Sequence, residues 1–257
     1  MSDAARYLQA VAEVAKVAGN FAMSHYKTGV DITIKGDGSP VTIADRGAEE
    51  VARAWVEARF PDDGIVGEEF GTLRPNAARR WIIDPIDGTK SFVRSVPLWG
   101  TLVAVAEHDH VIAGCAYFPP VEELVAAAIG EGCFWNGTRC AVSTVATLSE
   151  ATVLSTDTRF PDRPIRFERW NVLANQANVA RTWGDCYGYL MVATGRAEAM
   201  VDDIVSSWDA AALQPIIEEA GGVFTDWQGN ATAFGGDAIA TNAALAQQVR
   251  AILTEQV

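Results

Sequence analysis

Apolar residues near the N-terminus, from Leu8 to Ala22, lie three or four positions apart, which is the spacing of an amphipathic helix. The pattern predicts a helix over residues 4–23, and a second helix is expected over residues 43–59, where Pro61 ends it. Short apolar runs, and segments in which apolar and polar residues alternate, are typical of strands. We predict strands at residues 30–35, 64–67, 80–83, 100–107, 111–117 and 124–129.

From about residue 152 the pattern changes to an alternation of strands and helices, which indicates an α/β unit. The predicted strands are 153–155, 197–201, 223–225 and 238–241, and the predicted helices are 165–177, 187–194, 207–220 and 242–253. No low-complexity linker separates the two halves of the chain. We therefore predict two closely packed subdomains, residues 1–150 and 151–257, with catalytic groups where they meet.

The composition indicates a folded globular protein, with 49% hydrophobic and 21% charged residues in a chain of 257. The 20 Lys and Arg residues are outnumbered by 33 Asp and Glu residues, which gives a formal net charge of −13. So acidic a surface repels phosphate backbones, and we expect no nucleic-acid partner. Composition alone leaves open where the surplus carboxylates lie, because a solvated acidic surface and a buried metal site contain the same residues.

Other signals favour a cytoplasmic protein with no membrane segment. No apolar run approaches the roughly 20 residues that a spanning helix requires, and the first residues lack the basic and apolar regions of a signal peptide. The cysteines are irregularly spaced and include no CxxC pair, so we expect reduced thiols. They are Cys115, Cys133, Cys140 and Cys186.

The segment 81–89, Trp-Ile-Ile-Asp-Pro-Ile-Asp-Gly-Thr, contains two acids three positions apart after a short apolar run. The run predicts a strand that delivers Asp84 and Asp87 into a turn, which Pro85 stiffens and Gly88 allows to bend sharply. Both carboxylates can then face one cavity. Oxygen ligands clustered at the end of a strand suit hard divalent cations such as Mg²⁺.

A single Asp-Pro or Asp-Gly turn, or an acid at a helix start, has an ordinary structural explanation. Here, however, Gly-Glu-Glu at 67–69, Asp-Pro-Ile-Asp-Gly-Thr at 84–89 and Trp-Asp at 208–209 occur together. In this order they resemble the metal-binding segments of the inositol monophosphatase-like family of Mg²⁺-dependent phosphatases. The similarity extends over nearly the whole chain. It implies an α/β fold, a layered α/β/α/β sandwich that is usually a homodimer.

The resemblance also implies which residues hold the metal. Glu68, Asp84 and the backbone carbonyl of Ile86 would bind a first Mg²⁺, and Asp84, Asp87 and Asp209 would bind a second. A third, weaker ion would lie near Glu68. Two cations neutralise a phosphate monoester, which otherwise repels an anionic nucleophile.

Catalytic and phosphate-binding roles follow from the same resemblance. Asp45 would form a hydrogen bond with Thr89, and this pair, with Glu68, would orient and deprotonate the attacking water. The backbone amides of Gly88 and Thr89, together with Asp87, would face the phosphate, since a turn residue lets the backbone approach closely.

Residues 90–94 and 183–189 are similar to the histidinol-phosphate phosphatase branch of this family, which implies a substrate with an ammonium group and an imidazole. Acids are suitable partners for these groups, and the candidates are Asp185 and Asp202. Asp185 is alternatively the cap of the helix that follows it. Two other functions remain open: a phosphatase for inositol or sugar phosphates, and a non-catalytic interaction module.

Overall fold

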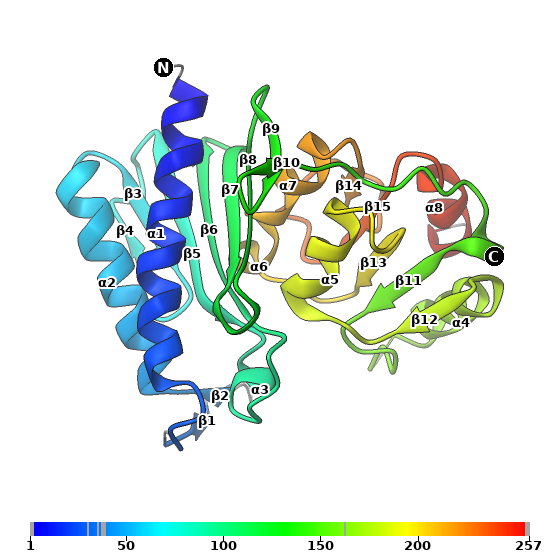
Figure 1. The fold of residues 1–257 in the computed structure, drawn as a ribbon, viewed down its shortest axis with the longest axis horizontal. Helices are drawn as coiled ribbons and strands as arrows, with labels where there is room; N and C mark the ends of the chain where they lie inside the picture. The colour runs from blue at the N-terminus through cyan, green and yellow to red at the C-terminus, as the bar shows by residue number, and fades with distance from the viewer. Residues whose placement is uncertain (1–2, 30, 35, 37–39, 162, 255–257) are drawn as a thin grey trace.

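Helices and sheets stack in five layers in the part of the chain that the structure describes (Figure 1). The structure is a computed structural model that describes residues 3–29, 31–34, 36, 40–161 and 163–254. The helices are α1 (Asp3–His25), α2 (Ile43–Arg59), α3 (Thr89–Phe92), α4 (Pro164–Gln176), α5 (Asp185–Ala193), α6 (Ser207–Ala210), α7 (Leu213–Glu219) and α8 (Ala246–Thr254).

The first sheet has eight strands in the order β10-β9-β8-β7-β6-β5-β3-β4. Neighbouring strands are antiparallel except for β3 and β5, which are parallel. The strands are β3 (Gly64–Gly67), β4 (Gly71–Leu73), β5 (Arg79–Asp87), β6 (Gly100–Glu107), β7 (His110–Phe118), β8 (Glu123–Ala128), β9 (Gly132–Trp135) and β10 (Thr138–Arg139). A separate pair, β1 (Thr33–Ile34) and β2 (Pro40–Val41), lies near the start of α2.

The second sheet has five strands in the order β12-β11-β13-β15-β14. The strands are β11 (Thr152–Ser155), β12 (Val179–Arg181), β13 (Ala199–Asp202), β14 (Val223–Thr225) and β15 (Ala238–Thr241). The first sheet therefore ends at β10 and the second begins at β11, on either side of the predicted boundary at residue 150.

Alternating side chains of each central strand enter different cores, because successive residues of a strand point to opposite faces of the sheet. In β5, Trp81 and Ile83 pack under α1 and α2, whereas Ile82 faces the middle helical layer. In β11, Leu154 belongs to the same middle core as Ile82, and Val153 packs against α4 and α8. The predicted α/β/α/β order is confirmed, and α4 with α8 adds a further helical layer.

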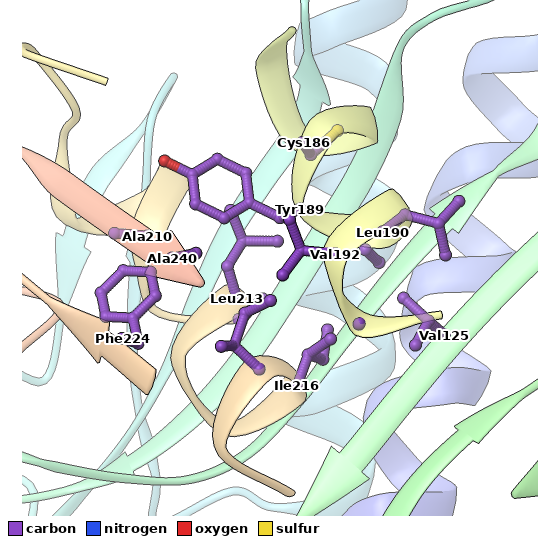
Figure 2. Packing of buried hydrophobic residues seen from close by; sticks show 14 of the residues in the cluster. Val125, Cys186, Tyr189, Leu190, Val192, Ala210, Leu213, Ile216, Phe224 and Ala240 are labelled. Atoms are coloured by element: carbon purple, nitrogen blue, oxygen red, sulfur yellow. The ribbon is translucent and has the colours of Figure 1, made fainter. Parts of the chain in front are cut away.

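The middle layer of α5, α6 and α7 joins the two sheets through one hydrophobic core. Figure 2 shows Tyr189 and Leu190 of α5 packed with Leu213 and Ile216 of α7, beside Phe224 of the second sheet. All five side chains are at least nine-tenths buried. The two halves of the chain therefore share a core and hold each other in position.

Several sequence predictions differ from the structure. The helix predicted over residues 207–220 is wrong: two helices, α6 and α7, occupy this segment, since Pro215 has no N–H and its ring obstructs the preceding turn of a continuous helix. The predicted turn after Ile83 is also wrong, because β5 continues to Asp87 through a shift in register. The prediction missed the strands β2, β4, β9, β10 and β12 and the short helix α3.

Other predicted bounds need only small adjustment. The last helix begins at Ala246, after a turn in which the N–H of Leu245 donates to the side chain of Asn242. Of the strand predicted at 30–35, residues 33–34 form β1, while residues 30 and 35 lie outside the described residues. No helix within the described part of the chain is both long and apolar enough to cross a membrane.

At Gly114 of β7, the first sheet and the middle layer approach each other closely. A Cβ atom at this position would overlap the backbone carbonyl of Ala212, between α6 and α7. Because backbone cannot move aside as a side chain can, the strand needs a residue without a side chain at this position.

We expect Gly114→Ala to destabilise the protein by about 1–3 kcal/mol, the usual effect of adding a methyl group to a fully packed site. Urea unfolding followed by circular dichroism measures the change. Gly36→Ala is the matched control, since its Cβ would meet no atom within 4 Å. Equal unfolding midpoints for the two variants would contradict this account of the packing.

Candidate active site

Three carboxylates converge at the end of β5. Asp84, Asp87 and Asp209 each place an oxygen within 4.8 Å of the other two. The shift in register between Asp84 and Asp87 rotates the strand, so that both side chains reach the same side. The structure thus brings together three of the four predicted acidic metal ligands.

Backbone amides fix the direction of these carboxylates. Asp84 Oδ1 accepts a hydrogen bond from the N–H of Ile86 at 3.0 Å. Asp87 Oδ2 accepts one from the N–H of Cys186 in the first turn of α5, at 2.5 Å. Asp209 Oδ2 accepts one from Ser206 at 2.7 Å. Asp209 therefore completes the capping box at the start of α6, whose N-cap is Ser206, and also joins the cluster.

The cluster is electrostatically unfavourable as bare anions. Burial, and then repulsion from Glu68, Asp87 and Asp209, raises the pKa of Asp84 well above its ordinary value. Burial, followed by repulsion from Asp185 and Asp209, does the same for the pKa of Asp87. Burial is also the main cause that raises the pKa of Asp209 to about 6.

The donor set fits a hard divalent cation. All the convergent groups are oxygens, and the carboxylates destabilise one another in the absence of a positive charge. Mg²⁺ prefers such ligands and commonly uses a few carboxylates together with water and a substrate phosphate. The cluster could therefore bind metal, as the sequence predicts.

A cavity of about 210 Å³ opens over the cluster. Its wall gathers most of the residues singled out from the sequence, which come from the first sheet, α3 and the middle layer. They are Glu68, Asp84, Ile86, Asp87, Gly88, Thr89, Asp185 and Asp209, with Pro40 and Lys90 beside them. The acidic residues that the sequence analysis expected at the site therefore line the same cavity, except for Asp45 and Asp202.

Asp45 lies beside Thr89, which is one of the residues that line this cavity. The hydroxyl of Thr89 lies 3.4 Å from Asp45 Oδ1, but it donates its shorter bond, of 2.9 Å, to the carbonyl of Ile86. Asp45 Oδ2 accepts from the N–H and the hydroxyl of Thr42, both at 2.7 Å, and so closes the capping box of α2. The predicted pair is adjacent, with Asp45 held firmly by its own helix.

Asp202 and Asp185 line a second cavity of about 80 Å³, which adjoins the first at Asp87 and Asp209. Asp202 accepts hydrogen bonds from the N–H of Thr156 and the hydroxyl of Tyr189, each at 3.0 Å. Burial raises the pKa of Asp185 and of Asp202 to about 6.

Gly184, and not Asp185, is the N-cap of α5, so the interpretation of Asp185 as the helix cap is wrong. Asp185 has a left-handed backbone with φ of 49°. Its N–H donates to Thr156 Oγ1 at 2.8 Å, and its carboxylate lies close to Gly88. This strained position directs the acid toward the turn at Gly88 rather than along the helix.

Sequence reasoning missed Glu49, a completely buried carboxylate on α2. Glu49 Oε2 accepts from the N–H of Glu69 at 2.7 Å, and Oε1 accepts from Arg53 Nε at 2.7 Å and from the N–H of Phe70 at 3.2 Å. These bonds fix the loop that follows β3 and carries Glu68. A signal was available, because Glu49 interrupts the alanine-rich buried face of the helix.

Gly67 allows this arrangement. A Cβ atom there would overlap the carboxylate of Glu49, so only glycine lets the buried acid reach the loop amides. Tyr189 lies in the segment 183–189 that the resemblance singles out, but sequence reasoning gave it no individual role; in the structure its hydroxyl donates to Asp202.

A family model described as the inositol monophosphatase family matches residues 3–256. The chain belongs to this family of metal-dependent phosphatases, and its layered fold is that of the family.

Two curated proteins and one solved structure illustrate which members of the family this chain is similar to. The histidinol-phosphatase of Chlorobaculum parvum is 42% identical over 233 residues, and the aligned region covers 90% of this chain and 90% of that protein. The histidinol-phosphatase of Mycobacterium tuberculosis is 39% identical over 223 residues, which cover 85% of this chain and 86% of that one. The solved inositol monophosphatase of Zymomonas mobilis is 29% identical and superposes with a TM-score of 0.88, over 99% of this chain and 100% of its own.

The raised carboxyl pKa values predict that Mg²⁺ stabilises the protein more at neutral than at acidic pH. A carboxyl whose pKa is higher in the folded than in the unfolded chain favours folding below the unfolded pKa, and this contribution is lost as the pH rises through the folded pKa. A bound cation offsets that loss. We therefore expect Mg²⁺ to raise Tm more near about pH 7.5 than near about pH 5.

Differential scanning fluorimetry with either Mg²⁺ or a chelator measures this difference. Asp84→Asn is the comparison variant: it removes the carboxylate that is predicted to bind both metal ions, and it should reduce the Mg²⁺ response at neutral pH. If Mg²⁺ raised Tm equally at both pH values, or raised it as much in Asp84→Asn as in the wild type, the stabilisation would not come from this carboxylate cluster.

Glu49→Gln should raise the Mg²⁺ concentration needed for half-maximal activity by about 10-fold, the lower end of effects seen for groups that orient metal ligands. The amide cannot accept all three hydrogen bonds that the Glu49 carboxylate now accepts, two of which come from the Glu68 loop. Glu50→Gln, an exposed change on the same helix, is the control. Loss of stability with an unchanged Mg²⁺ requirement would show that Glu49 acts on folding alone.

Proposed function

We propose that this phosphatase hydrolyses L-histidinol phosphate to L-histidinol and phosphate, with Mg²⁺ as its cofactor. The observation that carries the proposal is the second cavity, where Asp185 and Asp202 extend the acidic site beyond the phosphate position. A cationic alcohol half suits such a cavity, whereas an uncharged sugar gains less from it. Both histidinol-phosphatases described above are consistent with this substrate.

Two or three Mg²⁺ ions would be held by the residues at the end of β5 and around it. Glu68, Asp84 and the carbonyl of Ile86 would hold one, and Asp84, Asp87 and Asp209 would hold another. When bound, Mg²⁺ neutralises the phosphoryl oxygens, lowers the pKa of water and stabilises the leaving alkoxide. No phosphorylated protein intermediate is then required.

The nucleophilic water would be oriented by Thr89, Asp45 and Glu68. A shift of the Thr89 hydrogen from the Ile86 carbonyl to Asp45 Oδ1 requires only rotation of the hydroxyl, since both acceptors are already close. The Thr89 oxygen can then accept a hydrogen from the water, and the Glu68 carboxylate can accept the other.

Phosphate would be held by the turn into α3. Gly88, with φ of 83°, lets the backbone amides at Gly88 and Thr89 approach the ester closely. Lys90 is the single cation among the described residues that line the larger cavity, and its ammonium can pair with a phosphoryl oxygen. Asp87 would lie on the substrate side of the metal.

Asp185 and Asp202 would contribute differently to recognition of the amino group and imidazole. Both oxygens of Asp202 already accept hydrogen bonds from the protein, so this acid mainly supplies charge and positions Tyr189. Asp185 faces both cavities and is the better partner for the substrate ammonium.

We also propose a cytoplasmic homodimer that acts on a small phosphate ester. The dimer follows from the resemblance to the family. The surplus of acid over base supports the absence of a nucleic-acid partner. The convergent carboxylates argue against a purely binding descendant, which would have no physical reason to retain an arrangement this unfavourable.

Purified protein should hydrolyse histidinol phosphate with a higher kcat/KM than inositol 1-phosphate, and Asp185→Asn should reduce the first value by about 10–100-fold. That range corresponds to the loss of one hydrogen bond to a charged group. Phosphate release under steady-state conditions measures both quantities. Hydrolysis of a phosphate ester whose alcohol half carries no positive charge, such as p-nitrophenyl phosphate, should change much less.

Asp109→Asn, in the exposed turn between β6 and β7, is the matched control for the loss of one acid. Equal efficiency with inositol 1-phosphate would overturn the substrate assignment and favour the inositol phosphatase alternative. A uniform loss on every ester in Asp185→Asn would show that this residue serves the phosphate or the metal.

A further inference from the structure

Two thiols face each other at the free edge of the first sheet, far along the sheet from β5. Cys140 Sγ lies 3.5 Å from Cys133 Sγ, and no disulfide joins them in this structure. Cys133 is at the start of β9 and is completely buried, whereas Cys140 follows β10 and is half-buried. One sulfur is therefore shielded and the other lies nearer to solvent.

The backbone geometry of this pair suits a covalent link. The register pairs Thr138 with Trp135 and Arg139 with Phe134, so Cys140 is next in line opposite Cys133. The N–H of Cys140 donates to the carbonyl of Cys133 at 3.0 Å. Residues paired in this way have Cα atoms about 5.5 Å apart, which lies within the usual range for disulfides.

Both sides of the hairpin are anchored to α7. The N–H of Gly132, beside Cys133, donates to Glu219 at 2.8 Å, as does that of Gly130. The N–H of Val142, just after Cys140, donates to the carbonyl of Ala220 at 3.0 Å. The two sulfurs are therefore held in position. Forming a bond between them would restrict little additional backbone, so its cost in conformational entropy is small.

We propose that Cys133 and Cys140 form a reversible two-electron oxidation site whose co-substrate is a low-molecular-weight disulfide. The Cys140 thiolate attacks the small disulfide, forms a mixed disulfide and releases one thiolate. Cys133 Sγ then loses its proton and attacks Cys140 Sγ, which breaks the mixed disulfide and releases the second thiolate. The two cysteines lose two protons and two electrons, and one small disulfide becomes two thiols.

The order of attack follows from the surroundings. The hydrogen bond between the two sulfurs lowers the pKa of Cys140 and raises that of Cys133, and burial raises the latter further. Metal binding is a weaker explanation, because no third metal-binding side chain groups with these thiols within the described part of the chain. Cys115 and Cys186 are buried, and burial raises the pKa of each thiol.

Treatment of the folded full-length protein with excess oxidised glutathione tests the proposal. Of four thiols in the wild type, two should disappear, and peptide mapping without reductant should find Cys133 linked to Cys140 with no lasting glutathione adduct. Dithiothreitol should restore all four thiols. Cys133→Ala should instead retain a stable glutathione adduct on Cys140, and Cys115→Ala should form the link as the wild type does.

Persistence of all four thiols, a lasting adduct on the wild type, or a link to another cysteine would each overturn the proposal. If Cys133→Ala does not fold, as judged by circular dichroism, the mapping of the wild type and of Cys140→Ser decides the question, since the latter can form no such link. None of these measurements requires phosphatase activity, so the result is independent of the substrate.

Discussion

The crowding of carboxylates at the end of β5 is the constraint on which the rest of the structure depends. Asp84, Asp87 and Asp209 are close together and largely removed from water, where their charges repel one another. Such an arrangement exists only because surrounding structure holds it. The packed helices, the two sheets and the backbone amides that fix each side chain supply that support, and a bound divalent cation would relieve the repulsion.

The site is assembled from both halves of the chain. The first half supplies Glu68, Asp84 and Asp87 from neighbouring parallel strands, and the second half supplies Asp209 and the acids of the smaller cavity. The middle helices make this possible, because their side chains enter one core with residues of both sheets. Under the proposed function, both halves of the chain would contribute metal ligands, whereas the acids that recognise the alcohol half would come from the second half alone.

Sequence patterns predicted α1, α2 and the central strands well, because their apolar positions repeat over many residues. They could not predict β4 or β10, which are too short to show a period. Pro215 did carry a signal that the helix at 207–220 divides. Glu49 was missed because burial, and not residue type, gives that carboxylate its role, and burial depends on the loop that folds over it.

The bond between Asp87 and α5 has a consequence for how the family diversifies. Its donor is the backbone N–H of residue 186, so any residue other than proline preserves it. The neighbouring side chains of α5 can then change without disturbing the orientation of Asp87. Under the proposed function, in which this helix contacts the alcohol half of the substrate, substrate preference could therefore change on α5 while the orientation of Asp87 remains intact.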